Sequence, residues 1–468
     1  MRKMMLINPH PPGRHGEESI TVIVQMPLNL AYIATLTPGN WEFDVIDENK
    51  ELALDEKEEN ITFKDRKIDL VAITAVTYQV ARAYKIAAVC RKEGIPVVIG
   101  GIHASVMTDE VAKYADAVVV GEAEEVWPQL IKDFEEGKLK KIYNGGLPPL
   151  SKLKNIYPDR ELMKGKYGYQ FSSIITTKGC PNACDFCSVP TFQGRKFRER
   201  PYEDVLAEME ATTYKGLMLA EDNFYGHSVK SNERARNLFK GMVERGIKKD
   251  WLGFTALNIS QDPVVLDYMA KSGNFGMLIG IESTNEQVLE KMNKKTNLRL
   301  GVHQYHDAIQ RIHDHGLVVW GSVVFGADGD DKDSFKKMTD FILNNNIDIL
   351  TFGIDCPFPN TPLFHRLSSE GRIFRKNFPT DWKYYDTAHV VHRFVDITLE
   401  DFINGMQYVY DHLYAGDNLR TRFRNSIKTM GNPRNAMFAF RVGNDWKQVF
   451  EQVLENLKEL YNAGAYYK

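Results

Sequence analysis

Three of the chain's five cysteines lie close together in the stretch TTKGCPNACDFCSVP (176–190). They are Cys180, Cys184 and Cys187, with the spacing Cys-x3-Cys-x2-Cys. Thiolates bind zinc or iron–sulfur clusters, and one loop can bring several sulfurs to a single centre. Cys356 and Cys90 lie far away in the sequence, so a fourth cysteine ligand is not at hand. The loop predicts a four-iron cluster with one open iron. The simpler alternatives are buried thiols or a zinc site completed by a histidine.

Acidic and hydroxyl side chains follow two other apolar runs. LMLAEDNFYG (217–226) ends in Glu221, Asp222 and Asn223, and LIGIES (278–283) ends in Glu282 and Ser283. A carboxylate in a partly dry site pairs well with an ammonium group. Each of these residues could instead only cap the helix that follows.

These residues need strands to position them, and short apolar runs recur along the chain. In the first part the predicted strands are 4–8, 41–47, 69–76, 96–100 and 116–121. In the second part they are 172–177, 216–221, 251–257, 276–282, 317–326 and 348–354. Helical stretches such as 78–94 and 232–246 alternate with them. Continuous apolar strands alternating with helices indicate α/β units with parallel sheets.

The expected organisation has four parts. Residues 1–145 form a doubly wound, Rossmann-like (flavodoxin-like) α/β domain, and the Gly-, Pro- and Lys-rich stretch 146–168 is a linker. Residues 169–370 form a partial (β/α)6 barrel of the TIM type, with the cysteine loop after its first strand, where barrel active sites lie. Residues 371–468 form a helical C-terminal domain that covers the substrate.

Composition narrows the class of protein. The net charge of −3 favours neither nucleic acid nor an acidic membrane surface as a partner. Five cysteines, unevenly spread, do not form a secreted disulfide framework. We found no apolar run long enough to span a bilayer and no secretory signal, so a cytoplasmic location is expected.

The cysteine loop resembles the signature loop of the radical S-adenosylmethionine (SAM) superfamily. The resemblance implies that Cys180, Cys184 and Cys187 hold a [4Fe–4S] cluster whose open iron chelates SAM. It also implies reductive cleavage of SAM and removal of a hydrogen atom from an unactivated carbon. The implied SAM contacts are Phe186 at the adenine; Glu221, Asp222 and Asn223 at the amino group; Glu282 and Ser283 at the ribose and carboxylate; Val324 and Gly326 behind the adenine; and Arg195 with Arg198 at the carboxylate. A solvated basic turn is an equally good interpretation of the two arginines.

The first domain resembles the cobalamin-binding subclass of that superfamily. The matching stretch is GGIHAS (100–105) with ADAVVVGEAEE (115–125). The positions implied to contact cobalamin are Thr74, Val76, Gly100, Gly101, Gly121, Glu122 and His103. The Asp-x-His-x-x-Gly element that gives cobalt a histidine ligand is absent, and His10 and His15 lack its context. His103 is more simply interpreted as a histidine held within a turn. Some members with this domain use no cobalamin.

The C-terminal region resembles, more weakly, that of hopanoid methylases and related lipid- or tetrapyrrole-modifying enzymes. Its many aromatic residues could line an apolar substrate tunnel or simply pack the domain onto the barrel. Tyr384, Tyr385, His389 and His392 are candidates for a proton-handling group, and the first three are our catalytic candidates.

The predicted function is cobalamin-dependent C-methylation of a lipid or tetrapyrrole-type small molecule by a radical SAM enzyme. Its expected partners are an apolar small-molecule substrate and an electron donor such as flavodoxin or ferredoxin. The first alternative is a radical SAM cyclase, oxidase or carbon–carbon coupling enzyme without methyl transfer. The second is a non-catalytic iron–sulfur or zinc protein that binds a partner.

Overall fold

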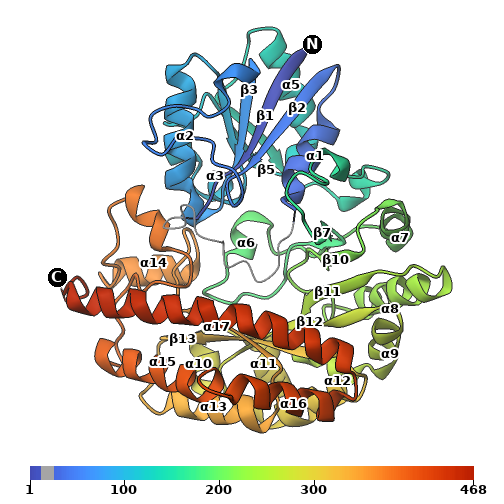
Figure 1. The fold of residues 1–468 in the computed structure, drawn as a ribbon, viewed down its shortest axis with the longest axis vertical. Coiled ribbons are helices and arrows are strands. Elements are labelled where there is room, and N and C mark those ends of the chain that lie inside the picture. The colour runs from blue at the N-terminus through green and yellow to red at the C-terminus, as the bar shows by residue number, and fades with distance from the viewer. Residues whose placement is uncertain (12–25, 468) are drawn as a thin grey trace.

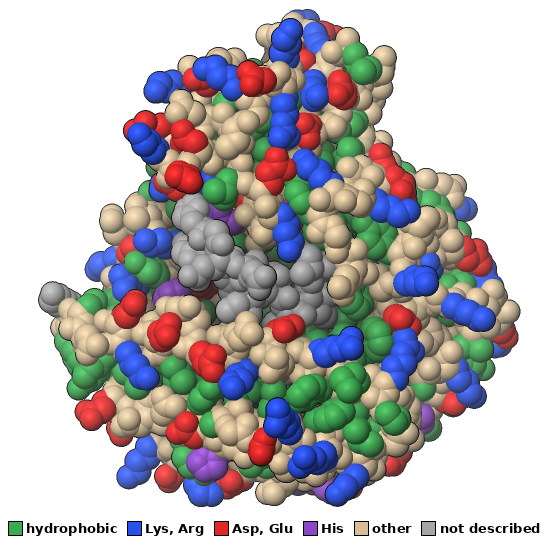
Figure 2. All heavy atoms as spheres, viewed as in Figure 1, with side chains coloured by type: hydrophobic (Ala, Val, Ile, Leu, Met, Phe, Trp, Pro, Cys, Tyr) green, Lys and Arg blue, Asp and Glu red, His purple; other side chains and the backbone are tan. Residues whose placement is uncertain are grey.

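A computed structural model describes residues 1–11 and 26–467 of the chain. Two six-stranded parallel sheets dominate it (Figure 1). The first sheet and its helices form the upper part of the view, and the second sheet forms the lower part. No helix of the described residues is long and apolar enough to cross a membrane. Figure 2 shows basic and acidic side chains interspersed over the face that it draws.

The first sheet has the strand order β2-β1-β3-β4-β5-β6. Alternate residues of β1 enter different cores, since Met4 and Leu6 belong to one apolar cluster and Met5 and Ile7 to another. Helices therefore cover both faces, as expected of a doubly wound sheet. The strands are β1 (Arg2–Asn8), β2 (Trp41–Asp47), β3 (Leu70–Thr74), β4 (Val97–Gly100), β5 (Ala117–Gly121) and β6 (Ile142–Gly146), and the helices are α1 (Leu28–Leu36), α2 (Val80–Lys92), α3 (Ile102–Val106), α4 (Thr108–Val111) and α5 (Trp127–Glu135).

Strand β6 was missing from the sequence prediction, which gave this sheet five strands. The strand reads IYNGG, and of its five residues only Tyr143 is buried. Its position at the edge of the sheet explains why it lacks the continuous apolar character of the central strands.

The second sheet has the order β14-β13-β12-β11-β10-β7, and all six predicted strands are present. It is an open, partial barrel, because β7 and β14 are its two edges. The strands are β7 (Phe171–Ile174), β10 (Gly216–Leu219), β11 (Asp250–Thr255), β12 (Asn274–Glu282), β13 (Val318–Phe325) and β14 (Ile349–Ile354). The helices are α7 (Tyr202–Ala211), α8 (Val229–Glu244), α9 (Pro263–Lys271), α10 (Glu286–Lys291), α11 (Lys295–Leu300), α12 (Tyr305–His313) and α13 (Ser334–Asn344).

The C-terminal part is helical, as predicted. The long helix α17 crosses the front of the barrel in Figure 1 and carries Phe450, which packs against Phe352 of β14 at 4.1 Å between ring centroids. The helices are α14 (Pro362–Ser369), α15 (Leu399–Leu413), α16 (Asn418–Met430) and α17 (Pro433–Asn462). The segment between α14 and α15 contains a short 3-10 helix at Thr380–Tyr384, and Trp382 of this helix belongs to the same apolar cluster as Met5 and Ile7 of the first sheet.

Candidate active site

The cysteine loop starts directly after the first barrel strand and is closed at its base. Strands β8 (Thr177–Lys178) and β9 (Arg198–Glu199) pair antiparallel, so residues 179–197 form one loop that includes the short helix α6 (Val189–Phe192). Gly179 has φ +83°, and a Cβ there would lie 2.4 Å from the carbonyl oxygen of Lys196. Only glycine therefore fits the turn that leads into Cys180.

The three cysteine thiols share one electrostatic environment. Cys180 and Cys184 are buried, Cys187 is half-buried, and burial raises the pKa of all three thiols, that of Cys187 to about 12. The ammonium group of Lys294 acts in the opposite direction on each of them. Buried thiols grouped around a cation fit a metal cluster, because metal binding requires and stabilises the thiolate.

The grouping differs from that of a single-ion site. Among residues 1–11 and 26–467, no three His, Cys, Asp or Glu side chains are placed to hold one metal ion. The cysteines of an iron–sulfur cluster bind through separate iron atoms and do not need to meet at one point.

Glu221 and Asp222 follow the end of β10 and place two carboxyl groups in the candidate site. Each carboxyl group has one buried oxygen without a hydrogen-bond partner. Oε2 of Glu221 accepts hydrogen bonds from the hydroxyls of Thr176 and Thr177, whereas its buried Oε1 has no hydrogen-bond partner. Oδ2 of Asp222 is also buried without a partner, and its carboxylate acts on Cys180 and Cys187. Burial raises the pKa of Glu221 to about 7 and that of Asp222 to about 6. Unpaired buried oxygens beside the cysteines fit the ammonium group of SAM.

Glu282 faces the cysteines from the end of β12 and is paired with a cation. Nζ of Lys294 lies 2.5 Å from Oε1 of Glu282 and 5.7 Å from the ring centroid of Phe186. Gly280 makes room for this pair, because a Cβ there would lie 2.4 Å from the same carboxylate oxygen. Glu282 and Phe186 are thus brought together, through a lysine that the sequence analysis did not identify.

Phe186 also packs in a small apolar cluster with Val324 of β13. The cluster contains Val288, Met292 and Ala327 as its buried members. Two residues predicted to lie at the adenine therefore share one apolar surface.

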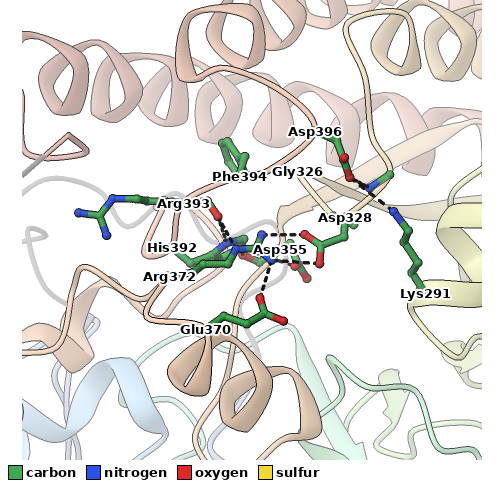
Figure 3. Close-up of polar contacts among 12 residues, drawn as sticks. Lys291, Gly326, Asp328, Asp355, Glu370, Arg372, His392, Arg393, Phe394 and Asp396 are labelled. Carbon is green, nitrogen blue, oxygen red and sulfur yellow. Dashed lines mark hydrogen bonds and ion pairs between the residues drawn. The ribbon is translucent and has the colours of Figure 1, made fainter.

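Gly326 has a different neighbour from the one expected. Its φ is +83°, and a Cβ would lie 2.6 Å from the ring of Phe394, which belongs to the C-terminal segment. Figure 3 shows Phe394 beside Gly326 and, below them, Asp328 joined to Arg372 at 2.7 Å. The close approach at Gly326 therefore docks the C-terminal segment onto the barrel.

Ser283 and Asn223 lie at the edge of the site. The hydroxyl of Ser283 accepts a hydrogen bond from the backbone N–H of Asn285, which is itself the N-cap of α10. Asn223 lines a cavity of about 190 Å³ together with Asn182 of the cysteine loop and Arg299 of α11. Its side chain also accepts hydrogen bonds from Thr255 and from the backbone of Tyr225.

A larger cavity, of about 790 Å³, lies between the two sheets. Its walls come from the carboxyl ends of β1 to β5 on one side and from β7, β10 and α6 on the other. Parallel sheets of this kind bind ligands at that edge, where the strand order reverses. The volume is within the range of sites for large ligands. Six of the seven predicted cobalamin contacts line this cavity: Thr74, Val76, Gly100, Gly101, Gly121 and Glu122.

Strand β4 ends in the glycine pair Gly100 and Gly101, and the backbone around Gly101 leaves no room for a side chain. Gly101 has φ +98°, and a Cβ would lie 2.8 Å from the carbonyl oxygen of Ala75 and 2.9 Å from the hydroxyl oxygen of Thr74. The β3 and β4 turns are therefore packed backbone to backbone at the cavity wall.

His103, the seventh predicted contact, points elsewhere. It is fully buried, with Nδ1 3.3 Å from the Thr77 hydroxyl and Nε2 3.3 Å from Oε1 of Glu110, and its ring packs edge-on against Trp382. This arrangement does not support a cobalamin contact at His103, because the residue does not line the cavity and both ring nitrogens lie near partners in the core. His10 does not line the cavity either. His15 lies outside the described residues.

Glu122 connects the cavity to the cysteine loop. Its carboxylate lies 2.5 Å from Nη2 of Arg198 and 3.2 Å from Nζ of Lys178, and Lys178 also pairs with Glu124 at 3.1 Å. We call these four residues the interdomain ion cluster. Arg198 therefore serves this ion cluster, and Arg195 lies exposed. Neither arginine meets the expectation of a SAM carboxylate contact.

The catalytic candidates of the C-terminal region separate into two kinds. Tyr385 is fully buried and donates a hydrogen bond to the backbone carbonyl of Arg375 at 2.8 Å, which supports a packing role and not a catalytic one. Tyr384 and His389 are half-buried neighbours, 5.3 Å apart between ring centroids. His392 is fully buried, with Nε2 3.0 Å from the carbonyl oxygen of Asp355.

Two sequence models match separate parts of the chain. The B12 binding domain model matches residues 24–131, and the radical SAM superfamily model matches residues 174–342. Bacteriochlorophyllide d C-12(1)-methyltransferase of Chlorobaculum tepidum is 32% identical over 398 residues, which is 83% of each chain. The chain belongs to the cobalamin-binding radical SAM enzymes. The expectation of this family, drawn from the cysteine loop and the GGIHAS stretch, is confirmed.

Two further comparisons extend this result. The anaerobic magnesium-protoporphyrin IX monomethyl ester cyclase of Rubrivivax gelatinosus is 26% identical, over 76% of this chain and 69% of its own. The radical SAM methyltransferase TsrM of Kitasatospora setae, solved with cobalamin and a [4Fe–4S] cluster, has a TM-score of 0.68 at 16% identity. That likeness covers 98% of this chain and all of TsrM, and it shows that the two share a fold.

The cofactors of this radical SAM enzyme are a [4Fe–4S] cluster, SAM and cobalamin. When bound, they supply reductive cleavage of SAM, hydrogen removal from an unactivated carbon, and a methyl group. The three cysteines are the residues that would hold the cluster. The unpaired carboxylate oxygens would hold the SAM ammonium, and the cavity of about 790 Å³ would hold cobalamin.

Proposed function

We propose that this enzyme methylates an unactivated carbon of a tetrapyrrole. The observation that carries the proposal is the large cavity between the sheets, whose walls include both the cobalamin-type glycine turns and the strands that lead into the cysteine loop. A methyl donor and a site of hydrogen removal need to face one substrate. The similarity at 32% identity to a bacteriochlorophyllide methyltransferase supports the tetrapyrrole class.

We assign the chain's own residues three tasks. Glu221 and Asp222 bind and orient an ammonium group beside the cysteines. Lys294 neutralises negative charge there, and Phe186 with Val324 offers an apolar face to a flat ring. The C-terminal segment docks at the carboxyl ends of β13 and β14 through Phe394 and Thr387, and we assign it the task of shielding a reactive carbon from water.

The test uses enzyme purified without oxygen and loaded with iron, sulfide and cobalamin. It is incubated with SAM, a chemical reductant and bacteriochlorophyllide d as the probe. We expect a product heavier by one methyl group, with S-adenosylhomocysteine and 5′-deoxyadenosine formed together. The Cys184→Ala variant should form none of these. Release of 5′-deoxyadenosine alone, with an unmethylated but altered probe, would overturn methyl transfer.

That second outcome corresponds to the alternative function, oxidation, cyclisation or carbon–carbon coupling without methyl transfer. The similarity to a magnesium-protoporphyrin monomethyl ester cyclase favours this alternative. The cyclase relative and the methyltransferase relative both have names that specify tetrapyrroles, so the proposed substrate class is the same for either reaction.

We further propose a cytoplasmic enzyme that receives electrons from a flavodoxin or ferredoxin. Reduction of the purified enzyme by reduced flavodoxin, followed through loss of the cluster's visible absorbance, tests this donor.

A further inference from the structure

The segment Asp386–His389 contains a carboxylate–imidazole pair that no catalytic task above uses. Nδ1 of His389 lies 3.0 Å from both carboxylate oxygens of Asp386. A carboxylate only accepts hydrogen bonds, so Nδ1 carries the proton and donates it. The lone pair of the imidazole is then on Nε2, for which no partner occurs among the described residues. The His389 side chain is 29% exposed, so its ring is partly accessible to a ligand.

This pair is held over the substrate side of the barrel. The backbone carbonyl of Thr387 accepts a hydrogen bond from the N–H of Ile354 at 2.8 Å, at the carboxyl end of β14. A Cβ on Gly353 would lie 3.3 Å from Cβ of Thr387. Gly353 is the register partner of Val324, and paired residues of parallel strands face the same side. Val324 and Phe186 of the cysteine loop both pack against the apolar cluster of Val288, Met292 and Ala327. Asp386 and His389 therefore flank Thr387, which lies against the carboxyl end of β14 beside Gly353.

We propose that His389 is the axial ligand of the metal ion chelated in a tetrapyrrole substrate, and that Asp386 positions its ring. Neutral imidazole is a common metal ligand, and ligating histidines usually donate their other N–H to a carboxylate, as His389 does. Haem iron is held in the same manner by a single histidine. Because the four ring nitrogens already bind the metal, one protein ligand is enough.

The surroundings fit a chelated metal better than a free ion. Residues 1–11 and 26–467 provide no group of three His, Cys, Asp or Glu side chains that could hold an ion. The ring of Tyr384 stands edge-on to His389 at 5.3 Å, and the guanidinium of Arg375 lies 4.1 Å from the centroid of Tyr384. Nζ of Lys383 lies 4.9 Å from the same centroid. Two cations around an aromatic ring suit an aromatic macrocycle with carboxylate side chains.

The inference rests on the proposed function, because it assumes a tetrapyrrole substrate. The test therefore compares zinc protoporphyrin IX with metal-free protoporphyrin IX, titrated into the full chain loaded with cluster and cobalamin. Binding and the position of the Soret band are measured. We expect the zinc porphyrin to bind more tightly and its Soret band to shift to longer wavelength, as axial nitrogen ligation requires.

The variants separate ligation from folding. His389→Ala should remove the Soret shift and the preference for zinc while leaving metal-free binding unchanged. Asp386→Asn should weaken binding of zinc porphyrin by about tenfold, the usual cost of losing the carboxylate behind a ligating histidine. His412→Ala is the matched control, because that histidine is exposed on α15 and bonds only to the Tyr408 carbonyl among the described residues. It should behave as the wild type.

Three results would overturn the inference. If wild-type enzyme binds both porphyrins equally and without a Soret shift, the axial ligand is wrong while the tetrapyrrole class stands. If the shift persists in His389→Ala, another residue is the ligand. If neither porphyrin binds, the tetrapyrrole class of the proposed function fails, and the axial ligand fails with it.

Discussion

At the scale of single residues, Lys294 is the cation on which the candidate site depends. It is surrounded by Glu282, Phe186 and two of the cysteines. Removing one partner of a buried ion pair costs about 3–5 kcal/mol, because the other charge is left buried alone. We expect Lys294→Met to lower the free energy of unfolding by about 3 kcal/mol. Urea denaturation of the apo chain measures this loss.

Lys291→Met is the control for that prediction. Lys291 is three positions earlier, is half exposed and pairs with Asp396 at 3.5 Å. Exposed pairs of this kind contribute about 0–1 kcal/mol, so the variant should unfold close to the wild type. Equal urea midpoints for the two variants would mean that the pair of Lys294 and Glu282 does not stabilise the site.

The carboxyl groups at the end of β10 predict how SAM binding depends on pH. Burial raises the pKa of Glu221 to about 7 and that of Asp222 to about 6. Only the ionised carboxylates attract an ammonium group, and they become protonated as the pH falls through these values. We expect SAM affinity to weaken by roughly tenfold between about pH 8 and about pH 6. Equilibrium dialysis with radiolabelled SAM measures the affinity.

Glu221→Gln should bind SAM more weakly at the higher pH and should show a flatter pH profile. Its side chain has a similar shape and can still accept a hydrogen bond from Thr176, so the loss would come from the missing charge. A wild-type affinity that does not change with pH would contradict the assignment of these carboxylates.

Some of these site residues could be predicted from the sequence and others could not, for physical reasons. The cysteines and the acids of β10 stand at the ends of apolar strands, where the period of the strand fixes their position. Lys294 follows a short helix and is adjacent to Lys295, and the sequence alone does not say which lysine turns inward. His103 has the sequence context of a cavity residue, yet Glu110 and Trp382 draw its ring into the core. Side-chain contacts that form only in the folded chain decided these cases.

At the scale of elements, the turn after β4 forms a wall of the large cavity. Gly101 combines φ +98° with a close approach to the β3 turn, so alanine there would be strained and would also clash with Ala75. Strain of this kind costs about 1–3 kcal/mol. We expect Gly101→Ala to unfold at lower urea concentration and to bind aquacobalamin more weakly, as measured by absorbance under anaerobic conditions.

The neighbouring Gly100 provides the comparison. A Cβ there would lie 3.6 Å from Cβ of Val119, an ordinary van der Waals contact. Gly100→Ala should therefore unfold within about 1 kcal/mol of the wild type. If Gly101→Ala were as stable as Gly100→Ala, the close packing of the β3 and β4 turns would not require glycine at position 101.

The elements themselves were largely predictable, because buried parallel strands are continuously apolar. All six barrel strands and five of the six strands of the first sheet were found this way. The exception, β6, is an edge strand with one buried residue. The segment between α14 and α15 could not be predicted, since its position depends on contacts such as Phe394 with Gly326, which join distant parts of the chain.

At the scale of the whole molecule, the two sheets share a cavity and are joined at it by the interdomain ion cluster. Lys178 immediately precedes the turn into Cys180 and pairs with Glu122 and Glu124 of the other sheet's loop. A ligand that fills the cavity touches both walls, since Glu122, Lys178 and Phe192 all line it. Cobalamin should therefore slow amide hydrogen exchange in both walls together.

Lys178→Met tests whether this ion cluster couples the walls. Without the lysine, we expect amides of residues 176–180 to exchange about tenfold faster and to gain less protection from cobalamin than residues 119–126. Lys152→Met is the matched control, because Lys152 pairs with Glu125 of the same segment but is exposed. Hydrogen exchange followed by mass spectrometry measures all three proteins with and without cobalamin. Protection confined to the first sheet in the wild type would contradict a shared site, because a ligand held by one wall would leave the cysteine loop unaffected.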